Sequence, residues 1–208
     1  PDTTMTIDSS TIQDNTASTD GGGIYNGGTL TVNQSMIAGN KSTALGGGIH
    51  NLGRVTVQDS TFRSNTAGFD GGGLNTYSKA TVTGSTFQDN SSKRGGGLAS
   101  VGGETTLTND TFSKNSASEM GGGIFNMGPV IGDPKPGGGM DANHITVAYN
   151  SASSGGGVSA SGGVMKIKNS IVALSQCVAE DFPASFTSLC PKSRTLSTVA
   201  ITATISSG

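Results

Sequence analysis

A glycine triplet followed by isoleucine, leucine or valine recurs along this 208-residue chain, as in GGGI at 21–24 and GGGL at 71–74. Asparagine keeps the interval more strictly, because it recurs at every twenty-fifth position from 15 to 115 and once more at 150. A linker has no reason to keep a fixed period, and a phosphate-binding glycine loop occurs once per domain. The period therefore constrains the chain to a repeat architecture, in which each unit stacks on the next.

Each repeat unit has the pattern of short β-strands. Apolar residues alternate with polar ones, as in Leu30 and Val32 or Val55 and Val57, which is typical of half-buried strands. Glycine and β-branched residues disfavour helix throughout. We expect about three strands per unit and predict an all-β fold, a right-handed parallel β-helix of about seven coils with a 25-residue period. The handedness follows from the general preference of β-crossover connections.

Equivalent residues of stacked coils would lie above one another in columns. The phenylalanine column predicts an aromatic stack inside the rod. The asparagine column predicts an inward ladder at a turn, where asparagine tolerates a left-handed backbone and its amide bonds to the next coil. The glycine triplets are expected at a corner that needs an unusual φ or a close approach of coils. The residues with predicted structural roles are Asn15, Asn40, Asn65, Asn90, Asn115, Asn150, Phe62, Phe87 and Phe112.

Composition and charge argue against several functions. Disorder is excluded because the chain is strictly periodic and only 12% of its residues are charged. The formal net charge is −2 and no basic run is longer than Lys93–Arg94, so nucleic-acid binding is not expected. No apolar stretch approaches the roughly 18 residues of a membrane helix, so direct membrane insertion is not expected either. The start at PDTTMTID is interpreted as that of a mature or excised segment.

Two motifs occur together in fixed phase: the glycine triplet with its apolar residue, and Phe-x-x-Asn, as FRSN at 62, FQDN at 87 and FSKN at 112. Over residues 4 to 176 this pattern resembles the repeat of the chlamydial polymorphic outer-membrane proteins and of related bacterial surface β-helix proteins. That family pairs Gly-Gly-Ala with Phe-x-x-Asn, whereas the third position here is glycine, so the resemblance is to the broader class. It implies a secreted or surface-displayed passenger, often adhesive and sometimes self-associating, and it carries over no catalytic residue.

The sequence predicts no catalytic, cofactor or metal-binding residue. A polysaccharide-cleaving β-helix needs acidic residues on neighbouring coils of one face. The exposed columns through Asp8, Asp14 and Asp20 hold no two carboxylates on adjacent coils. His50 and His144 lie in different coils without a nearby cysteine, so both are expected to be surface residues rather than zinc ligands. The outer threonine column that would suit ice begins as TMT and TLT but continues as RVT, KAT and ETT, and so becomes charged.

Two regions depart from the repeat. We predict a β-helix domain over 1–176, with an insertion loop at 129–139, and a C-terminal cap and terminal strand over 177–208. Cys177 and Cys190 flank a non-repetitive stretch, and we predict a disulfide between them, which would indicate an oxidising, extracellular setting; two free buried thiols are the alternative. The segment TLSTVAITATISSG is expected either to fold back on the last coil or to pair with a second copy.

The sequence thus predicts a non-catalytic rod, extracellular or at the cell surface, with a structural or adhesive role. Its expected partners are a second copy of itself, end to end, or a host or surface glycan or protein. Two alternatives stay open: a polysaccharide-binding or polysaccharide-cleaving β-helix, and an ice-binding β-helix.

Overall fold

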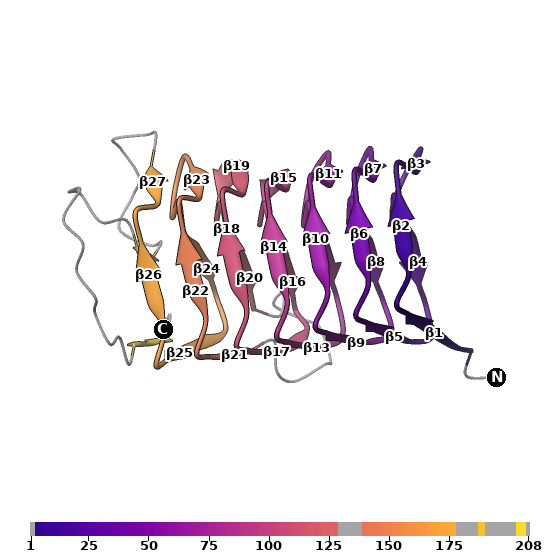
Figure 1. Cartoon of the computed structure of the whole chain (residues 1–208). Helices are drawn as coiled ribbons and strands as arrows, with labels where there is room; N and C mark the ends of the chain where they lie inside the picture. Colours follow the sequence, from indigo (N-terminus) through magenta and orange to yellow (C-terminus); the bar gives the residue numbers. More distant parts are fainter. Residues whose placement is uncertain (1–2, 129–138, 178–186, 190–202, 207–208) are drawn as a thin grey trace.

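The computed structural model describes residues 3–128, 139–177, 187–189 and 203–206. These residues form a rod of stacked coils, which runs from the N-terminal end to β26 (Ile171–Ala173) and β27 (Gln176–Cys177) at the other end (Figure 1). Each coil contributes one short strand to each of four sheets, named A to D in chain order. A coil therefore has four strands and not the three expected. The sequence pattern did not reveal the strands of sheet C, because most of them have only two residues.

The strands of each sheet follow the order of the coils. Sheet A contains β1 (Thr4–Asp8), β5 (Thr29–Asn33), β9 (Arg54–Gln58), β13 (Lys79–Thr83), β17 (Glu104–Thr108), β21 (Gly139–Asn143), β25 (Val164–Lys168) and β29 (Ala203–Ser206). Sheet B contains β2 (Thr11–Gln13), β6 (Met36–Ala38), β10 (Thr61–Arg63), β14 (Thr86–Gln88), β18 (Thr111–Ser113), β22 (Thr146–Ala148) and β26. Sheet C contains β3 (Thr16–Ala17), β7 (Lys41–Ser42), β11 (Thr66–Ala67), β15 (Ser91–Arg94), β19 (Ser116–Met120), β23 (Ser151–Ala152) and β27. Sheet D contains β4 (Ile24–Asn26), β8 (Ile49–Asn51), β12 (Leu74–Thr76), β16 (Leu98–Val101), β20 (Ile124–Met127), β24 (Val158–Ser161) and β28 (Thr187–Leu189).

Neighbouring coils pair in parallel at a constant register, which confirms the β-helix of about seven coils. Thr6 pairs with Thr31, 25 residues on. Across the insertion Glu104 pairs directly with Gly139, so no coil of sheet A intervenes there. Gly139 is the first residue of β21, not part of the loop predicted over 129–139; the rest of that loop, residues 129–138, lies outside the described residues. The right-handed winding stays a prediction.

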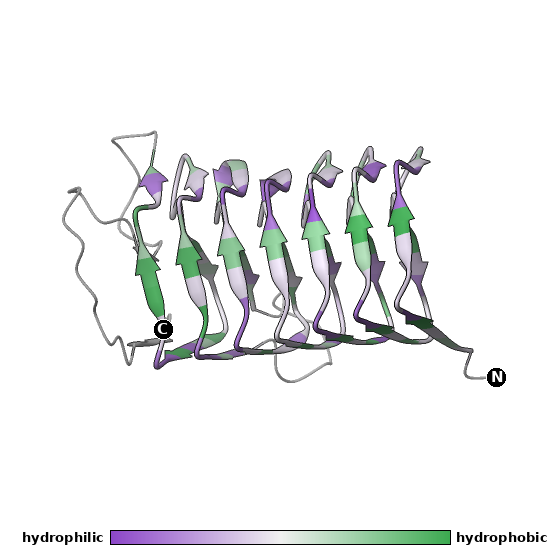
Figure 2. Ribbon diagram, viewed as in Figure 1, coloured by the Kyte–Doolittle hydropathy of each residue, from purple (hydrophilic) through white to green (hydrophobic). Residues whose placement is uncertain are grey.

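The core is a set of apolar columns that run along the rod axis. The rings of Phe62 and Phe87 stack 4.5 Å apart at 8°, and those of Phe87 and Phe112 stack 4.7 Å apart at 10°. All three side chains are fully buried, and Ile37 and Val147 continue their column on either side. The hydropathy of β26 is high along its whole length (Figure 2). Because each coil presents the same side chains at the same place, the interior is closed by stacking rather than by a second layer.

The asparagine column forms a continuous buried ladder. Asn65 donates from both its backbone N–H and its side-chain amide to Asn90 Oδ1, at 3.0 and 2.9 Å. The same amide also donates to the carbonyl of Ile37. Equivalent side-chain bonds join the column from Asn15 to Asn150, and Asn150 N–H donates to Ser175 Oγ in the last unit. The ladder fixes the register of the coils, because a slip would leave buried amides unpaired.

The left-handed residue at this bend is the one before each asparagine, not the asparagine as expected. Asp14, Ser64 and Tyr149 have φ of 57°, 55° and 60°. A second left-handed column lies at the bend between sheets A and B, where His144 has φ of 55° and is exposed as predicted. At both bends the left-handed residue turns the chain, and the next residue points inward; it is polar in most coils, but Ile145 follows His144.

The glycine triplets lie between sheets C and D, and a different constraint requires glycine at each of the three positions. Gly71 has φ of +65°, which L side chains rarely adopt. At Gly72 an added Cβ would lie 2.4 Å from the carbonyl oxygen of Gly96 on the next coil. At Gly73 it would lie 2.6 Å from Gly97 O and 2.9 Å from the ring of Phe87. The triplets are therefore structural. A bulge between Ser92 and Arg94 of β15 absorbs the one-residue shift of the fourth triplet.

The last two strands fold back on the final coil. β28 pairs antiparallel with β24, and β29 pairs antiparallel with β25, which is the first of the two alternatives predicted for the terminal segment. Cys177 lies in β27, and its Sγ accepts a hydrogen bond from the backbone N–H of Gly156 at 3.2 Å. Cys190 lies outside the described residues, so the disulfide between Cys177 and Cys190 stays a prediction.

Candidate functional site

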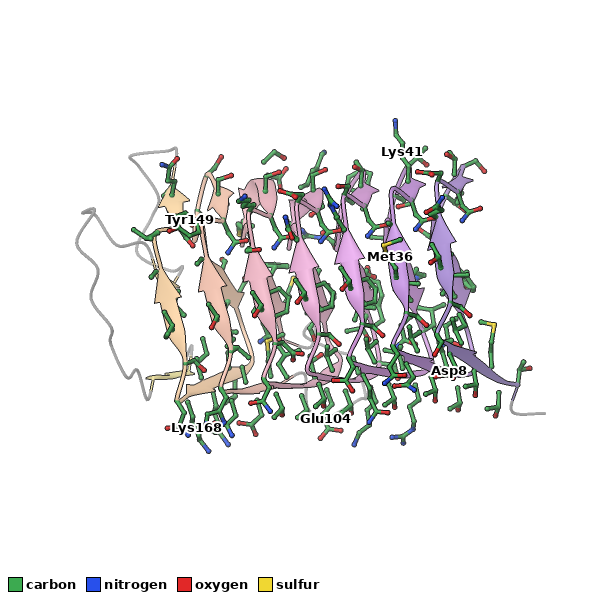
Figure 3. All side chains as sticks on the ribbon, in the orientation of Figure 1. Asp8, Met36, Lys41, Glu104, Tyr149 and Lys168 are labelled. Carbon is green, nitrogen blue, oxygen red and sulfur yellow. The ribbon has the colours of Figure 1, made fainter. Side chains whose placement is uncertain are left out.

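The outer side of sheet A is the broadest regular surface of the rod. Its strands have five residues each up to β25, so three side chains per strand point outward, as Asp8, Glu104 and Lys168 do in Figure 3. The first outward column reads Thr4, Thr29, Arg54, Lys79, Glu104, Gly139 and Val164. The second reads Thr6, Thr31, Thr56, Thr81, Thr106, Asp141 and Lys166. The face is threonine-rich toward the N-terminal coils and charged toward the C-terminal ones.

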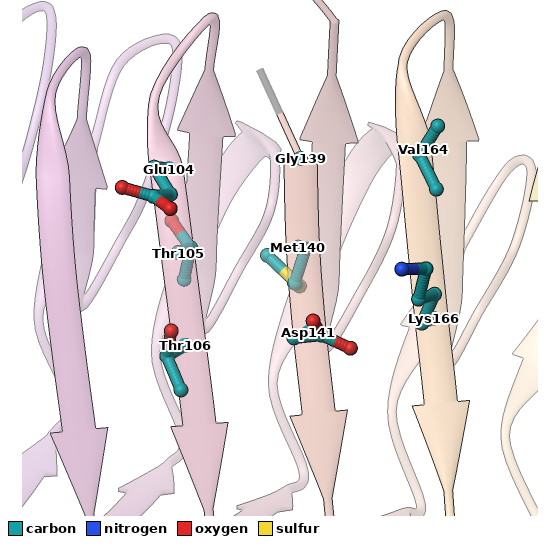
Figure 4. A pocket seen from close by; sticks show the side chains of 8 residues that line it. All are labelled: Glu104, Thr105, Thr106, Gly139, Met140, Asp141, Val164 and Lys166. Carbon is teal, nitrogen blue, oxygen red and sulfur yellow. The ribbon is translucent and has the colours of Figure 1, made fainter. Parts of the chain in front are cut away.

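A shallow groove of about 230 Å³ lies on this face where the first column lacks a side chain. It is open to solvent between β17, β21 and β25 (Figure 4). Thr105 and Met140 are almost fully buried and form its floor. The lining residues are Glu104, Thr105, Thr106, Gly139, Met140, Asp141, Val164 and Lys166.

The groove brings together two carboxylates and an ammonium group. Glu104 forms an ion pair with Lys79, with 3.1 Å between Oε2 and Nζ, so its charge is balanced on the neighbouring coil. Asp141 and Lys166 are register partners on β21 and β25. Groups of this kind form hydrogen bonds with hydroxyl groups or act in acid–base chemistry.

Sequence reasoning missed this pair of carboxylates. The columns searched for carboxylates pass through Asp8, Asp14 and Asp20, whereas Glu104 and Asp141 lie in two other columns, on either side of the insertion. Counting on from each side of the insertion would have placed Glu104 and Asp141 on adjacent coils. Glu104 and Asp141 lie in neighbouring columns and not in the same one, so they are not stacked directly above one another.

A second polar cluster lies on the outer side of sheet D and corrects the prediction for His50. His50 is only 2% exposed, because the rings of Tyr25 and Tyr77 lie on either side of it, with centroids 5.4 and 5.7 Å away. Its Nδ1 lies 2.9 Å from Asn75 Oδ1. Burial lowers the pKa of His50, against the opposing effects of the Asn75 hydrogen bond and the charge of Asp20.

The same cluster contains an ion pair between the buried Asp70 and the partly exposed Arg94. Arg94 donates from Nε and Nη2 to the two carboxylate oxygens of Asp70, at 2.7 and 2.8 Å. This hydrogen bonding raises the pKa of Arg94, and the guanidinium also lies 5.2 Å from the ring centroid of Phe125. Burial, followed by the charge of Asp70, raises the pKa of Tyr77. These groups are engaged with one another, so the cluster is best explained as the packing that covers sheet D.

Asp110 is a carboxylate inside the rod. It occupies a column of inward serines 25 residues apart, where each hydroxyl accepts from the backbone N–H of the coil before, as Ser85 Oγ does from Ser60 at 3.1 Å. Asp110 accepts from the N–H of Ser85 at 2.8 Å and from that of Thr108 at 2.9 Å. Burial outweighs these two bonds and raises the pKa of Asp110 from 3.8 to about 7. It faces the interior and so serves no solvent-exposed chemistry.

Neither a cluster of metal ligands nor a membrane-spanning helix is present in the part of the chain that the structure describes. Within those residues no group of three or more His, Cys, Asp or Glu side chains is placed to hold a metal ion. The same residues contain no helix long and apolar enough to cross a membrane.

The Chlamydia polymorphic membrane protein repeat is the family whose model matches this chain, at residues 9–27 and 111–127. The first match contains Asn15 and the first glycine triplet, and the second contains Phe112, Asn115 and the fifth triplet. These are the residues that form the ladder and the corner of a coil. Searches of curated proteins and of solved structures found no match. The stacked coils show that this chain is a β-helix repeat protein, and two of its repeats are similar to the repeat of the Chlamydia polymorphic membrane proteins.

Proposed function

We propose that the chain is a non-catalytic rod, extracellular or at the cell surface, that presents sheet A as a structural or adhesive surface. The observation that carries this proposal is the unbroken asparagine ladder, which continues across the insertion from Asn115 to Asn150. A polar ladder inside a closed core holds every coil at one register, and so the outward columns form a fixed array. Such an array suits repeated weak contacts with a surface better than it suits one reaction centre.

The charged groups on the outer face of sheet A support a non-catalytic function. General acid–base catalysis needs a group whose pKa is matched to its role, usually by burial or a like charge. Asp110, whose pKa is raised to about 7, is buried in the interior, out of reach of a substrate on this face. Glu104 is paired with Lys79 and its side chain is 66% exposed, so the two residues form a surface ion pair.

The rival activity is polysaccharide cleavage at the groove, which the carboxylates of Glu104 and Asp141 on adjacent coils favour. Neutral and acidic polysaccharides would be incubated with the protein and assayed for new reducing ends and for unsaturated products. We expect no turnover. Turnover that is abolished in Asp141→Asn and retained in Asp8→Asn, a matched exposed carboxylate at the far end of the same face, would replace the rod with an enzyme.

The adhesive role of sheet A is tested by placing charges on this sheet or on sheet B. Thr56→Lys and Thr81→Lys place cations on the outward column of sheet A, whereas Thr61→Lys and Thr86→Lys place the same charges on sheet B. Binding of each pair to cells and to immobilised glycans would be compared with the unchanged chain. We expect the sheet A pair to lose binding and the sheet B pair to keep it. Equal behaviour of the two pairs would show that sheet A is not the adhesive face.

A further inference from the structure

Gly139 removes one side chain from an otherwise filled column. Glu104 stands before it and Val164 after it, as direct register partners. The gap is the reason the groove exists, because the flanking side chains of the same column form its two ends (Figure 4). No other described position in this outward column is a glycine. The groove is therefore a single place on the rod and not a repeated feature.

The groups that face the groove are balanced in charge. Glu104 is neutralised by Lys79, which leaves the carboxylate of Asp141 and the ammonium of Lys166. The described residues contain two ion pairs, Lys79–Glu104 and Asp70–Arg94, and Asp141 is in neither. Asp141 and Lys166 thus offer one acceptor group and one donor group side by side. Val164 adds an apolar wall that is 41% exposed.

From this arrangement we infer that the groove binds one neutral pyranose residue of a glycan chain. A pyranose ring has hydroxyl groups that can donate to Asp141 and accept from Lys166, and C–H groups that can pack on Val164. A charged sugar would meet a like charge on either Asp141 or Lys166 and gain nothing from the balanced pair. The inference rests on the proposed adhesive function and names the ligand of that face.

The register also sets how a longer glycan would lie. The neighbouring outward residues toward the N-terminal coils are Thr106, Thr81 and Thr56, about 4.8 Å apart at the spacing of paired strands. Their hydroxyl groups can exchange hydrogen bonds with successive sugars along the rod axis. The groove would then hold one residue and the threonine column would hold its neighbours.

The variant that tests this inference is Gly139→Thr. A Cβ added at Gly139 has Val164 O at 3.4 Å as its nearest neighbour, which is ordinary contact, and the residue has no left-handed φ. The threonine would therefore fill the gap between Glu104 and Val164 without strain. Asp141→Asn and Lys166→Met remove the charges separately, and Thr29→Val is the control in the same column, four coils away.

Binding would be measured by saturation-transfer NMR and calorimetry with cellotetraose, mannotetraose and tetra-N-acetylchitotetraose as neutral probes. Tetragalacturonate and the glucosamine tetramer serve as the anionic and cationic probes. We expect a neutral probe to bind to the unchanged chain. Gly139→Thr and each charge variant should weaken the affinity for that probe about tenfold or more, and Thr29→Val should leave the affinity unchanged. The inference is overturned if no neutral probe binds, if a charged probe binds more tightly, or if Gly139→Thr binds as the unchanged chain does. Sugar turnover would refute the non-catalytic proposal but not this site.

Discussion

The buried carboxylate of Asp110 predicts that the rod loses stability as pH rises. Its side chain is 1% exposed, and the next coil offers the apolar Ile145 at the same ladder position. Burial raises the pKa of Asp110 to about 7, above its ordinary 3.8. A group with a raised pKa in the folded state stabilises the fold fully below the unfolded pKa. That contribution is lost as pH rises through the folded pKa.

The size of the effect follows from the two pKa values. The difference between 3.8 and about 7 is about 3 pKa units, and one unit corresponds to about 1.36 kcal/mol, so the loss between pH 4 and pH 8 is on the order of 4 kcal/mol. Asp110→Ser would remove this loss. A serine can accept from Ser85 N–H and donate to the carbonyl of Thr108, as Ser85 does toward Thr83 at 3.0 Å.

The assay is urea unfolding of the unchanged chain, Asp110→Ser and Asp141→Ser at a series of pH values from 4 to 8. Asp141→Ser removes an exposed carboxylate one strand away and serves as the control. We expect the stability difference between Asp110→Ser and the unchanged chain to shift in favour of the serine variant by a few kcal/mol across the range. If this difference is the same at pH 4 and pH 8, the assignment of the pH dependence to Asp110 is refuted.

Three further predictions concern the repeat itself. Gly73→Ala should cost about 2 kcal/mol or more, because its Cβ meets backbone at 2.6 Å, whereas Gly157→Ala meets Ser175 Oγ at 3.1 Å and should cost less than about 1 kcal/mol; equal urea midpoints would contradict this. Asn90→Ala should cost about 3 kcal/mol, because Asn65 N–H and the carbonyl of Phe62 lose buried partners; a loss under about 0.5 kcal/mol would show that the ladder does not hold the coils. Deletion of residues 203–208 removes β29 and exposes the edge of β25, so the shortened chain should associate at concentrations where the full chain stays monomeric in analytical ultracentrifugation. An unchanged sedimentation profile would show that β29 protects no edge.

Much of the fold could be predicted because a stacked coil repeats its chemistry at one spacing. Phe62, Phe87 and Phe112 are visible as a column in the sequence and as a ring stack in the structure. The asparagine ladder is visible for the same reason. The bend residue before each asparagine could not be predicted, because Asp14, Ser64 and Tyr149 share a backbone conformation but no side-chain chemistry.

The candidate site was harder to predict than the fold. His50 was expected at the surface because it lies in a different coil from His144 and has no cysteine nearby, and only the structure shows the flanking Tyr25 and Tyr77. The groove depends on Gly139, whose place in the first outward column is hidden by the insertion before it. Single exceptions to a repeat carry no periodic signal, so they need the three-dimensional register to be recognised.

The groove exists only if Glu104 and Gly139 are neighbours, which requires the coils to stay in register across the insertion. Electron–electron distance measurements would test this register. The spin labels would be attached to genetically encoded non-natural residues that replace Thr31 and Asp141, so that Cys177 and Cys190 stay unchanged. These positions are four coils apart in sheet A, so their backbones should be about 19 Å apart at the strand spacing. A second pair at Thr6 and Lys166, six coils apart, should give about 29 Å. We expect two distances in that proportion, whereas a Thr31–Asp141 distance longer by about 5 Å, one full coil, would show that an extra coil lies between the two residues.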